Sequence, residues 1–329
     1  MTVTAHSHML AATARRLTSR GRGILAADES IATMSQRLQG EGVEPSATSR
    51  RDYRQLLLTA PGLSRHVSGI IWCDETFGQE LSDGRPFPAA AAASGILPGI
   101  KVDTGTVPLP GGSGALVTEG LDGLGERLGS YAARGATFAK WRAVFHVSTI
   151  TPYAARANAQ ALARYAALCQ LHGIVPVVEP EVVATGAHDL VDCAVATRMA
   201  LGSLVEELLL ARVDLTGLVL KPNFVTPGLE CQAVSPQTVA TVTYDVLRDM
   251  VPADVAGIAF LSGGHPTEDA CAFLRKLNGI GGAPWTMTFS FGRALVNDAL
   301  ATWAGSTANV TLAQKALVAN CARAAAAAS

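Results

Sequence analysis

The sequence predicts a single α/β domain with the TIM (β/α)8 barrel fold. Eight short apolar runs, rich in Val, Ile and Phe, alternate with longer segments of helical periodicity. Within the runs hydrophobicity is nearly continuous rather than alternating, which is typical of parallel strands covered by helices on both faces. Eight β–α units in a chain of 329 residues indicate a barrel. A doubly wound open sheet with a similar number of strands is the alternative.

The elements are expected in a regular order along the chain. The expected strands are residues 23–28, 68–75, 98–102, 138–145, 175–182, 217–224, 257–264 and 286–291. An amphipathic helix is expected over about 1–20, as an N-terminal extension of the barrel domain that spans 1–329. Further helices are expected over 88–94, 163–173 with Gly173 after its end, 188–212, and 266–279 with a Thr–Glu cap at its start. A short helix is expected at the C-terminus.

Composition narrows the class of protein. Hydrophobic residues make up 49% of the chain and charged residues 16%, which allows a substantial core. The formal net charge of −1, without a Lys/Arg-rich tract, does not support nucleic-acid binding. The apolar runs are too short to span a membrane, and the N-terminus has no continuous apolar region of a secretory signal. Six cysteines without a C-x-x-C pair favour a reduced, cytoplasmic protein.

The stretch GLVLKPNF, residues 217–224, places an ammonium group at the end of an apolar strand. Only five of the 26 basic residues are lysine, so arginine serves almost wherever a plain positive charge suffices. A retained lysine is therefore a candidate for an amine that must lose its proton, because guanidinium stays protonated. Lys101, Lys140 and Lys221 lie in apolar runs, whereas Lys276 and Lys315 lie in helical surroundings and are expected on the surface.

Polar residues mark the ends of the expected strands. They are Asp28, Glu75, Lys101, Glu179 and Glu181, Lys221, Ser262 and Arg293, in chain order. In a barrel these carboxyl ends form the active-site face. Lys140 is the exception, because it lies nearer the start of its run. Glu179 and Glu181 are two positions apart and so share one side of their strand, between the strands of Lys140 and Lys221.

Glycine-bearing loops follow the last two expected strands. SGGH follows the seventh strand, and SFGRA leads from the eighth into a helix. In barrels such loops, ending at a helix N-terminus, commonly bind phosphate through backbone N–H groups. Arg293 is placed to clamp the anion.

This set of residues is suited to Schiff-base chemistry. A lysine in a partly apolar site, with a second cation nearby, can lose its proton and attack a ketone. The resulting iminium withdraws electrons and makes an adjacent C–C bond breakable. One carboxylate is then needed to shuttle protons during imine formation and another to deprotonate a β-hydroxyl. No H-E-x-x-H pattern or histidine cluster at metal-ligand spacing is present.

Several strings together identify a family resemblance. GRGILAADES, DGRPFP, GIKVD, FAKWR, VEPE, LKPN, FLSGG and FSFGRAL resemble class I fructose-bisphosphate aldolase, in the family's order, from about residue 20 to 305. The resemblance implies a TIM barrel, a homotetramer, and cleavage of fructose 1,6-bisphosphate to dihydroxyacetone phosphate and glyceraldehyde 3-phosphate. It implies no metal or other cofactor, and a sugar bisphosphate as the small-molecule partner.

The resemblance also assigns roles by position. Lys221 matches the Schiff-base lysine, and Glu179 the carboxylate that handles protons in imine formation. Asp28 matches the base near the C4 hydroxyl, and Lys140 the lysine that orients this pair; Glu181 is counted with the catalytic set. The matches at the phosphate near C1 are Ser262, Gly263 and Arg293, and those at the far phosphate are Ser30, Arg37 and Lys101. Thr33, Arg142, Gly264 and Gly292 complete the expected substrate-binding residues.

Three departures from the family's pattern stand out. The chain ends in ARAAAAAS without a tyrosine after Tyr244, where many eukaryotic members have a tail whose terminal tyrosine exchanges the proton at C3. Phe291 stands where tyrosine is frequent. Thr33 and Gln36 stand where serine and lysine are frequent, which leaves the preference between mono- and bisphosphate open.

Two other functions stay open at this point. One is a different Schiff-base barrel lyase, acting on a sugar phosphate or a keto acid, which would keep Lys221 but need only one phosphate site. The other is a non-catalytic barrel that serves as a scaffold. A metal-dependent class II aldolase is disfavoured by the missing histidine cluster.

Overall fold

Eight parallel strands close into a barrel in the computed structural model, which describes residues 3–329, with side chains from Ser7 onward. Their order around the barrel is β1-β10-β9-β8-β7-β6-β3-β2. The strands are β1 (Gly23–Ala27), β2 (Val67–Trp72), β3 (Leu97–Lys101), β6 (Phe138–Phe145), β7 (Val175–Val182), β8 (Val219–Leu220), β9 (Gly257–Phe260) and β10 (Met287–Phe291). The barrel prediction is confirmed, and each strand falls within or next to an expected run.

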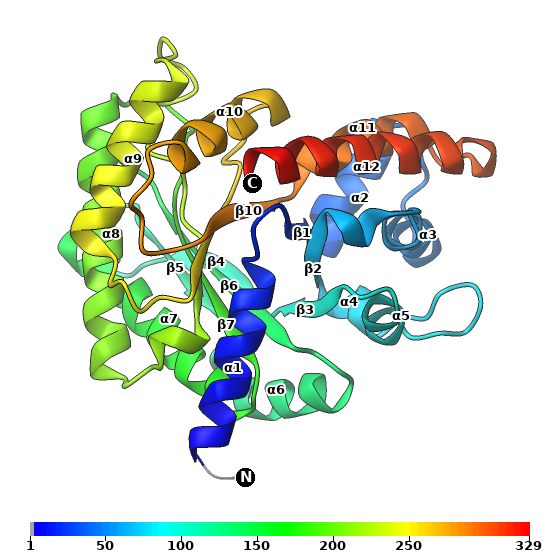
Figure 1. Ribbon diagram of the computed structural model, residues 1–329, viewed down its shortest axis with the longest axis horizontal. Helices are drawn as coiled ribbons and strands as arrows, with labels where there is room; N and C mark the ends of the chain where they lie inside the picture. The colour runs from blue at the N-terminus through cyan, green and yellow to red at the C-terminus, as the bar shows by residue number, and fades with distance from the viewer. Residues whose placement is uncertain (1–2) are drawn as a thin grey trace.

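Helices surround the barrel, as Figure 1 shows. They are α1 (Val3–Leu17), α2 (Ile31–Gly40), α3 (Ala47–Leu58), α4 (Asp74–Phe77), α5 (Phe87–Ala93), α6 (Leu124–Ala133), α7 (Pro152–Leu171), α8 (Leu190–Leu210), α9 (Pro236–Met250), α10 (Thr267–Asn278), α11 (Arg293–Trp303) and α12 (Val310–Ala327). Every residue of β1, β2, β7 and β10 is buried, which explains why their hydrophobicity does not alternate. Within residues 3–329, no helix combines the length and apolarity that crossing a bilayer requires.

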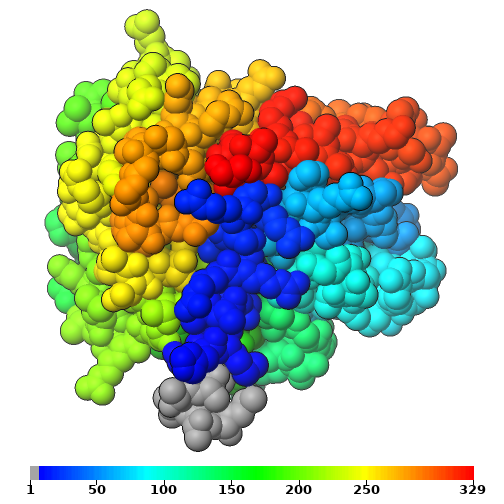
Figure 2. All heavy atoms as spheres, viewed as in Figure 1, coloured from blue at the N-terminus to red at the C-terminus, as the bar shows by residue number. Residues whose placement is uncertain are grey.

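The N-terminal helix α1 closes the end of the barrel where the strands begin. Leu10, Ala14 and Leu17 are buried in one cluster with Phe138 and other residues from the strands. Glycine makes room for this packing, because a Cβ on Gly69 would lie 2.7 Å from Leu17 Cδ2. Figure 2 shows α1 across this face, beside the last residues of α12. The active-site end of the barrel is therefore the opposite one, where the strands finish.

Two local predictions were wrong. The expected strand 217–224 is a two-residue strand preceded by a 3-10 turn, because Pro222 has no N–H to continue the ladder. Lys221 still donates its backbone N–H to Val178 O at 2.8 Å, so its side chain is held where a strand would place it. The start of α10 has Pro266 as its N-cap, and the Thr267 hydroxyl donates instead to the carbonyl of Ala294.

Two segments differ from the sequence-based outline in extent. An antiparallel hairpin, β4 (Gly105–Pro108) and β5 (Leu116–Glu119), was not predicted and follows β3 at the active-site end. The C-terminal helix α12, expected to be short, has 18 residues, and its buried face packs on α11 and α10.

Candidate active site

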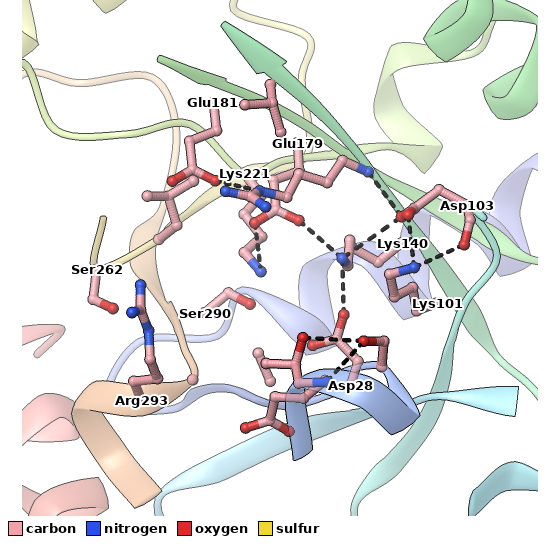
Figure 3. A pocket seen from close by; sticks show the side chains of 18 of the residues that line it. Asp28, Lys101, Asp103, Lys140, Glu179, Glu181, Lys221, Ser262, Ser290 and Arg293 are labelled. Atoms are coloured by element: carbon pink, nitrogen blue, oxygen red, sulfur yellow. Dashed lines mark hydrogen bonds and ion pairs between the residues drawn. The ribbon is translucent and has the colours of Figure 1, made fainter. Parts of the chain in front are cut away.

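A cavity of about 470 Å³ opens at the carboxyl ends of the barrel strands (Figure 3). All the site residues predicted from the sequence line it: Asp28, Ser30, Thr33, Arg37, Lys101, Lys140, Arg142, Glu179, Glu181, Lys221, Ser262, Gly263, Gly264, Gly292 and Arg293. Glu75, expected on the same rim, is not among the lining residues. It lies on α4, where it forms an ion pair with Arg50 at 2.5 Å, so that expectation was wrong.

Lys221 and Glu179 form the buried pair at the bottom of the cavity. Lys221 Nζ lies 3.0 Å from Glu179 Oε1, and both side chains are almost fully buried. The second carboxylate oxygen, Oε2, lies 3.3 Å from Lys140 Nζ but accepts no well-directed hydrogen bond. Burial by itself would raise the pKa of Glu179, but Lys221, Lys140 and Arg142 outweigh it, so the pKa is lowered. Glu179 is therefore ionised and within reach of the Lys221 amine.

Lys140 lies at the centre of the charges (Figure 3). Its Nζ is 2.8 Å from Asp28 Oδ2, 3.3 Å from Glu179 Oε2 and 3.8 Å from Asp103 Oδ2. Burial would lower the pKa of Lys140, but these three carboxylates raise it above its usual range. Burial would likewise raise the pKa of Asp28, but Lys140, with smaller effects of Lys221 and Lys101, lowers it to about 2.

The position of Lys140 near the start of its expected run has a simple geometric cause. The strand β6 has eight residues, and Lys140 pairs in register with Lys101, the last residue of the shorter strand β3. The remaining residues of β6 extend beyond this level beside β7, where Arg142 pairs in register with Glu179. Lys140 is thus level with the end of β3, although its own strand continues.

The loops after β9 and β10 form one end of the cavity. Gly263 and Gly264 have φ values of 59° and 89°, in the left-handed region that favours glycine. A Cβ on Gly264 would lie 3.8 Å from a terminal nitrogen of Arg293, so the two loops are close together. Arg293 is exposed at the N-terminus of α11, where no carboxylate in the described part of the chain pairs with it. This end offers a cation and a helix N-terminus to an anion.

The opposite end of the cavity contains a second group of polar residues. Ser30 caps the N-terminus of α2, and its hydroxyl lies 3.0 Å from that of Thr33. Lys101 lies 2.7 Å from Asp103 Oδ1. Arg142, which also lines the cavity, forms an ion pair with Glu181 at 2.5 Å. These groups supply cations and hydroxyls to a second anion.

Arg37, expected at the far phosphate, lines the cavity and has contacts that connect two helices. Its guanidinium forms an ion pair with Glu29 and donates to Asn297 Oδ1 at 2.9 Å. Asn297 lies one turn after Arg293 on α11, so Arg37 joins α2 to the helix that carries Arg293.

Residues 9–329 match the family model described as class I fructose-bisphosphate aldolase. The chain belongs to the class I fructose-bisphosphate aldolase family.

Individual relatives agree with this membership. The chain is 46% identical over 315 residues to cytosolic fructose-bisphosphate aldolase 6 of Arabidopsis thaliana, covering 95% of this chain and 88% of that relative. It is 47% identical over 310 residues to a probable class 1 fructose-bisphosphate aldolase of Xanthomonas campestris, covering 93% of each. A solved fructose-bisphosphate aldolase of Plasmodium falciparum, in complex with TRAP and a small-molecule inhibitor, superposes with a TM-score of 0.96 at 40% identity, covering 98% of this chain and 95% of that one.

The aldolase cavity also contains residues that the sequence did not reveal. Ser290 on β10 lines it with a buried hydroxyl that has no hydrogen-bond partner among the described residues, and Asp103 and Thr106 line it near Lys101. Asp103 follows Lys101 by two positions in GIKVD, which was an available signal. Ser290 lies on an apolar strand and carries no such signal. Phe291, the departure at this strand, is fully buried with its ring 5.5 Å from that of Phe289, outside the lining residues.

A second cavity of similar size lies away from the strand ends. It has a volume of about 490 Å³ and is lined by α5, by the end of α4 with the segment that follows it, and by the end of α6 with the segment that follows it. Among the residues that line it, Glu80 is the only carboxylate, and none is a lysine or a histidine. The ionisable side chains that the expected acid–base chemistry needs therefore line the cavity of Lys221.

Proposed function

We propose that the cavity of Lys221 cleaves fructose 1,6-bisphosphate reversibly to dihydroxyacetone phosphate and glyceraldehyde 3-phosphate, with Lys221 as the nucleophile. The observation that supports this most strongly is the buried amine of Lys221, 3.0 Å from Glu179, with Lys140 between this carboxylate and that of Asp28. A neutral amine can attack the C2 ketone, and Glu179 is near enough to take the proton that the ammonium must lose first.

The remaining steps use groups already close together. The attack gives a carbinolamine, and Glu179 returns a proton to its hydroxyl, which leaves as water to form the iminium. Asp28 accepts the proton of the C4 hydroxyl while the C3–C4 bond breaks, and the electron pair moves into the iminium to give an enamine. Protonation at C3 and attack by water then release dihydroxyacetone phosphate and free Lys221. Lys140 holds Asp28 and Glu179 ionised and apart, because its ammonium contacts both.

The two ends of the cavity support binding of two phosphates. Arg293 with the Ser262–Gly264 loop and Gly292 is assigned to the phosphate near C1, where the helix N-terminus favours a dianion. Lys101, Ser30 and Arg37 are assigned to the far phosphate, together with Thr33, whose hydroxyl lies beside that of Ser30.

The experiment that tests the activity is a substrate profile. The enzyme and its Lys221→Arg variant would be assayed with fructose 1,6-bisphosphate, fructose 1-phosphate and a 4-hydroxy-2-keto acid, with and without EDTA. We expect cleavage of the first two that is insensitive to EDTA and absent in Lys221→Arg, because guanidinium cannot form the imine. Preference for the keto acid would favour a different Schiff-base lyase, and no activity would favour a scaffold.

We further propose a cytoplasmic homotetramer. Several large apolar side chains on α8 are exposed: Val191 at 67%, Val195 at 56%, Leu209 at 57% and Leu210 at 70%. Leu171, at the end of the neighbouring helix α7, is 75% exposed. Large exposed apolar patches mark protein–protein contacts, and relatives at 44–46% identity are named cytosolic or cytoplasmic. Sedimentation velocity would measure the assembly, and a monomer at micromolar concentration would contradict it.

A further inference from the structure

Two lysines face one another across paired strands at the edge of the catalytic set. Lys101 on β3 and Lys140 on β6 are in direct register, and both side chains line the cavity. Two ammonium groups in such positions repel each other unless an anion lies between them. Asp103 supplies this anion: Oδ1 is 2.7 Å from Lys101 Nζ, and Oδ2 is 3.8 Å from Lys140 Nζ (Figure 3).

Asp103 is fixed by the framework around it. Its side chain is 3% exposed, and Oδ2 also accepts the backbone N–H of Arg142 at 3.2 Å. The adjacent backbone is held on both sides, since the N–H of Val102 donates to Lys140 O and that of Thr104 to Glu119 O in the hairpin. Lys101 is held twice, because its Nζ also donates to the backbone carbonyl of Asp103 at 2.7 Å. Neither Lys101 nor Asp103 can therefore move without disturbing the other.

We propose that Asp103 is a positioning residue that joins the far-phosphate site to the cleavage site of the enzyme. Through Lys101 it sets the affinity for a substrate that carries the far phosphate. Through Lys140 it sets the placement of Asp28 and Glu179, and so the rate for every substrate. The proposal rests on the roles assigned above to Lys101 and Lys140, and it gives Asp103 no contact with the reacting atoms.

The two routes predict separable kinetic effects for Asp103→Asn, which keeps the shape of the side chain and loses its charge. On fructose 1,6-bisphosphate and fructose 1-phosphate alike, kcat should fall about tenfold, because Lys140 loses one of three carboxylates. KM should rise about fivefold for the bisphosphate and stay within about twofold for fructose 1-phosphate, because only the former engages Lys101. Asp103→Glu, which restores the charge, should recover part of kcat.

A double-mutant cycle with Lys101→Ala tests the division. In the Lys101→Ala background, Asp103→Asn should no longer change the ratio of the two KM values, but it should still lower kcat. The matched control is Asp122→Asn, the same chemical change at an exposed aspartate outside the cavity, which should alter neither constant. Thermal unfolding of each variant would report folding, because a loss of folded enzyme lowers apparent kcat equally and leaves both KM values unchanged.

Three results would overturn the proposal: an unchanged kcat on fructose 1-phosphate, equal KM changes for both substrates, or an effect on the KM ratio that persists in Lys101→Ala. These outcomes are distinct from failure of the proposed function. Borohydride trapping of dihydroxyacetone phosphate on Lys221 needs no far phosphate, so labelling of Asp103→Asn would show that the Schiff-base assignment stands whatever Asp103 does.

Discussion

Replacing Lys140 by methionine should lower the free energy of unfolding by an amount that depends on pH, because Asp28 and Glu179 lose their shared cation. The side chain of Lys140 is 4% exposed, and its Nζ lies 2.8 Å from Asp28 Oδ2. At this distance, with an effective dielectric constant of about 20, the attraction is about 6 kcal/mol, or roughly four pKa units. Relaxation of the site and entry of water offset part of the lost attraction. We therefore expect the pKa of Asp28 to rise from about 2 by two to three units, to about 4 to 5.

The sign of the effect follows from the direction of each shift. In the wild-type protein the pKa of Asp28 is below its unfolded value of 3.8, so ionised Asp28 stabilises the fold above that pH and the stability is lost as the pH falls through about 2. In the variant the folded pKa exceeds the unfolded value. Ionised Asp28 then destabilises the fold near neutral pH, and protonation relieves this as the pH falls. Glu179, whose pKa is also lowered in the wild type, adds in the same direction.

The expected destabilisation by Lys140→Met is about 3–4 kcal/mol near pH 7 and about 1 kcal/mol less near pH 4. Urea unfolding, followed by tryptophan fluorescence at one protein concentration, would measure it at both pH values. Lys315→Met is the matched control, because Lys315 is exposed on α12 and its loss should cost little at either pH. The same variant should lower kcat by about 10²- to 10⁴-fold. A destabilisation that is equal at both pH values, or greater near pH 4, would refute the electrostatic account.

Three further changes test individual parts of the site. Lys101→Ala should raise KM for fructose 1,6-bisphosphate about tenfold and leave that for fructose 1-phosphate nearly unchanged; steady-state kinetics decide, and equal losses would contradict the assignment. Arg293→Gln should raise KM for both substrates by about tenfold or more, since both carry the phosphate near C1. An increase confined to the bisphosphate would indicate that Arg293 binds the far phosphate instead. Glu179→Gln should slow the appearance of the borohydride-trapped adduct by about 10²-fold or more, and trapping at the wild-type rate would remove Glu179 from imine formation.

Much of the site could be predicted because barrel geometry turns order along the chain into position in space. A polar residue that ends an apolar strand must lie on the rim, which is how Asp28, Lys101 and Lys221 were found. Glu75 failed this rule because β2 already ends at Trp72, and the one-turn helix α4 turns Glu75 toward Arg50. A strand end is visible in the sequence only to within a few residues, and that is enough to change where a side chain points.

Other features left no sequence signal. The hairpin strands β4 and β5 have four residues each and are only partly buried, so their pattern resembles a loop. The hydroxyl of Ser290 is unusual only because it has no hydrogen-bond partner in a buried position, which the fold alone determines. The bridging role of Asp103 depends on the register of β3 with β6, which no local pattern specifies.

Trapping with borohydride tests most directly whether the amine of Lys221 forms the covalent bond to substrate. Sodium borohydride would be added to the enzyme with dihydroxyacetone phosphate, and the adduct would be mapped by peptide mass spectrometry. We expect reduction-dependent addition of the triose phosphate to the peptide that contains Lys221, and none in Lys221→Arg. Addition to Lys140 or Lys101 instead, with Lys221 unmodified, would contradict this assignment.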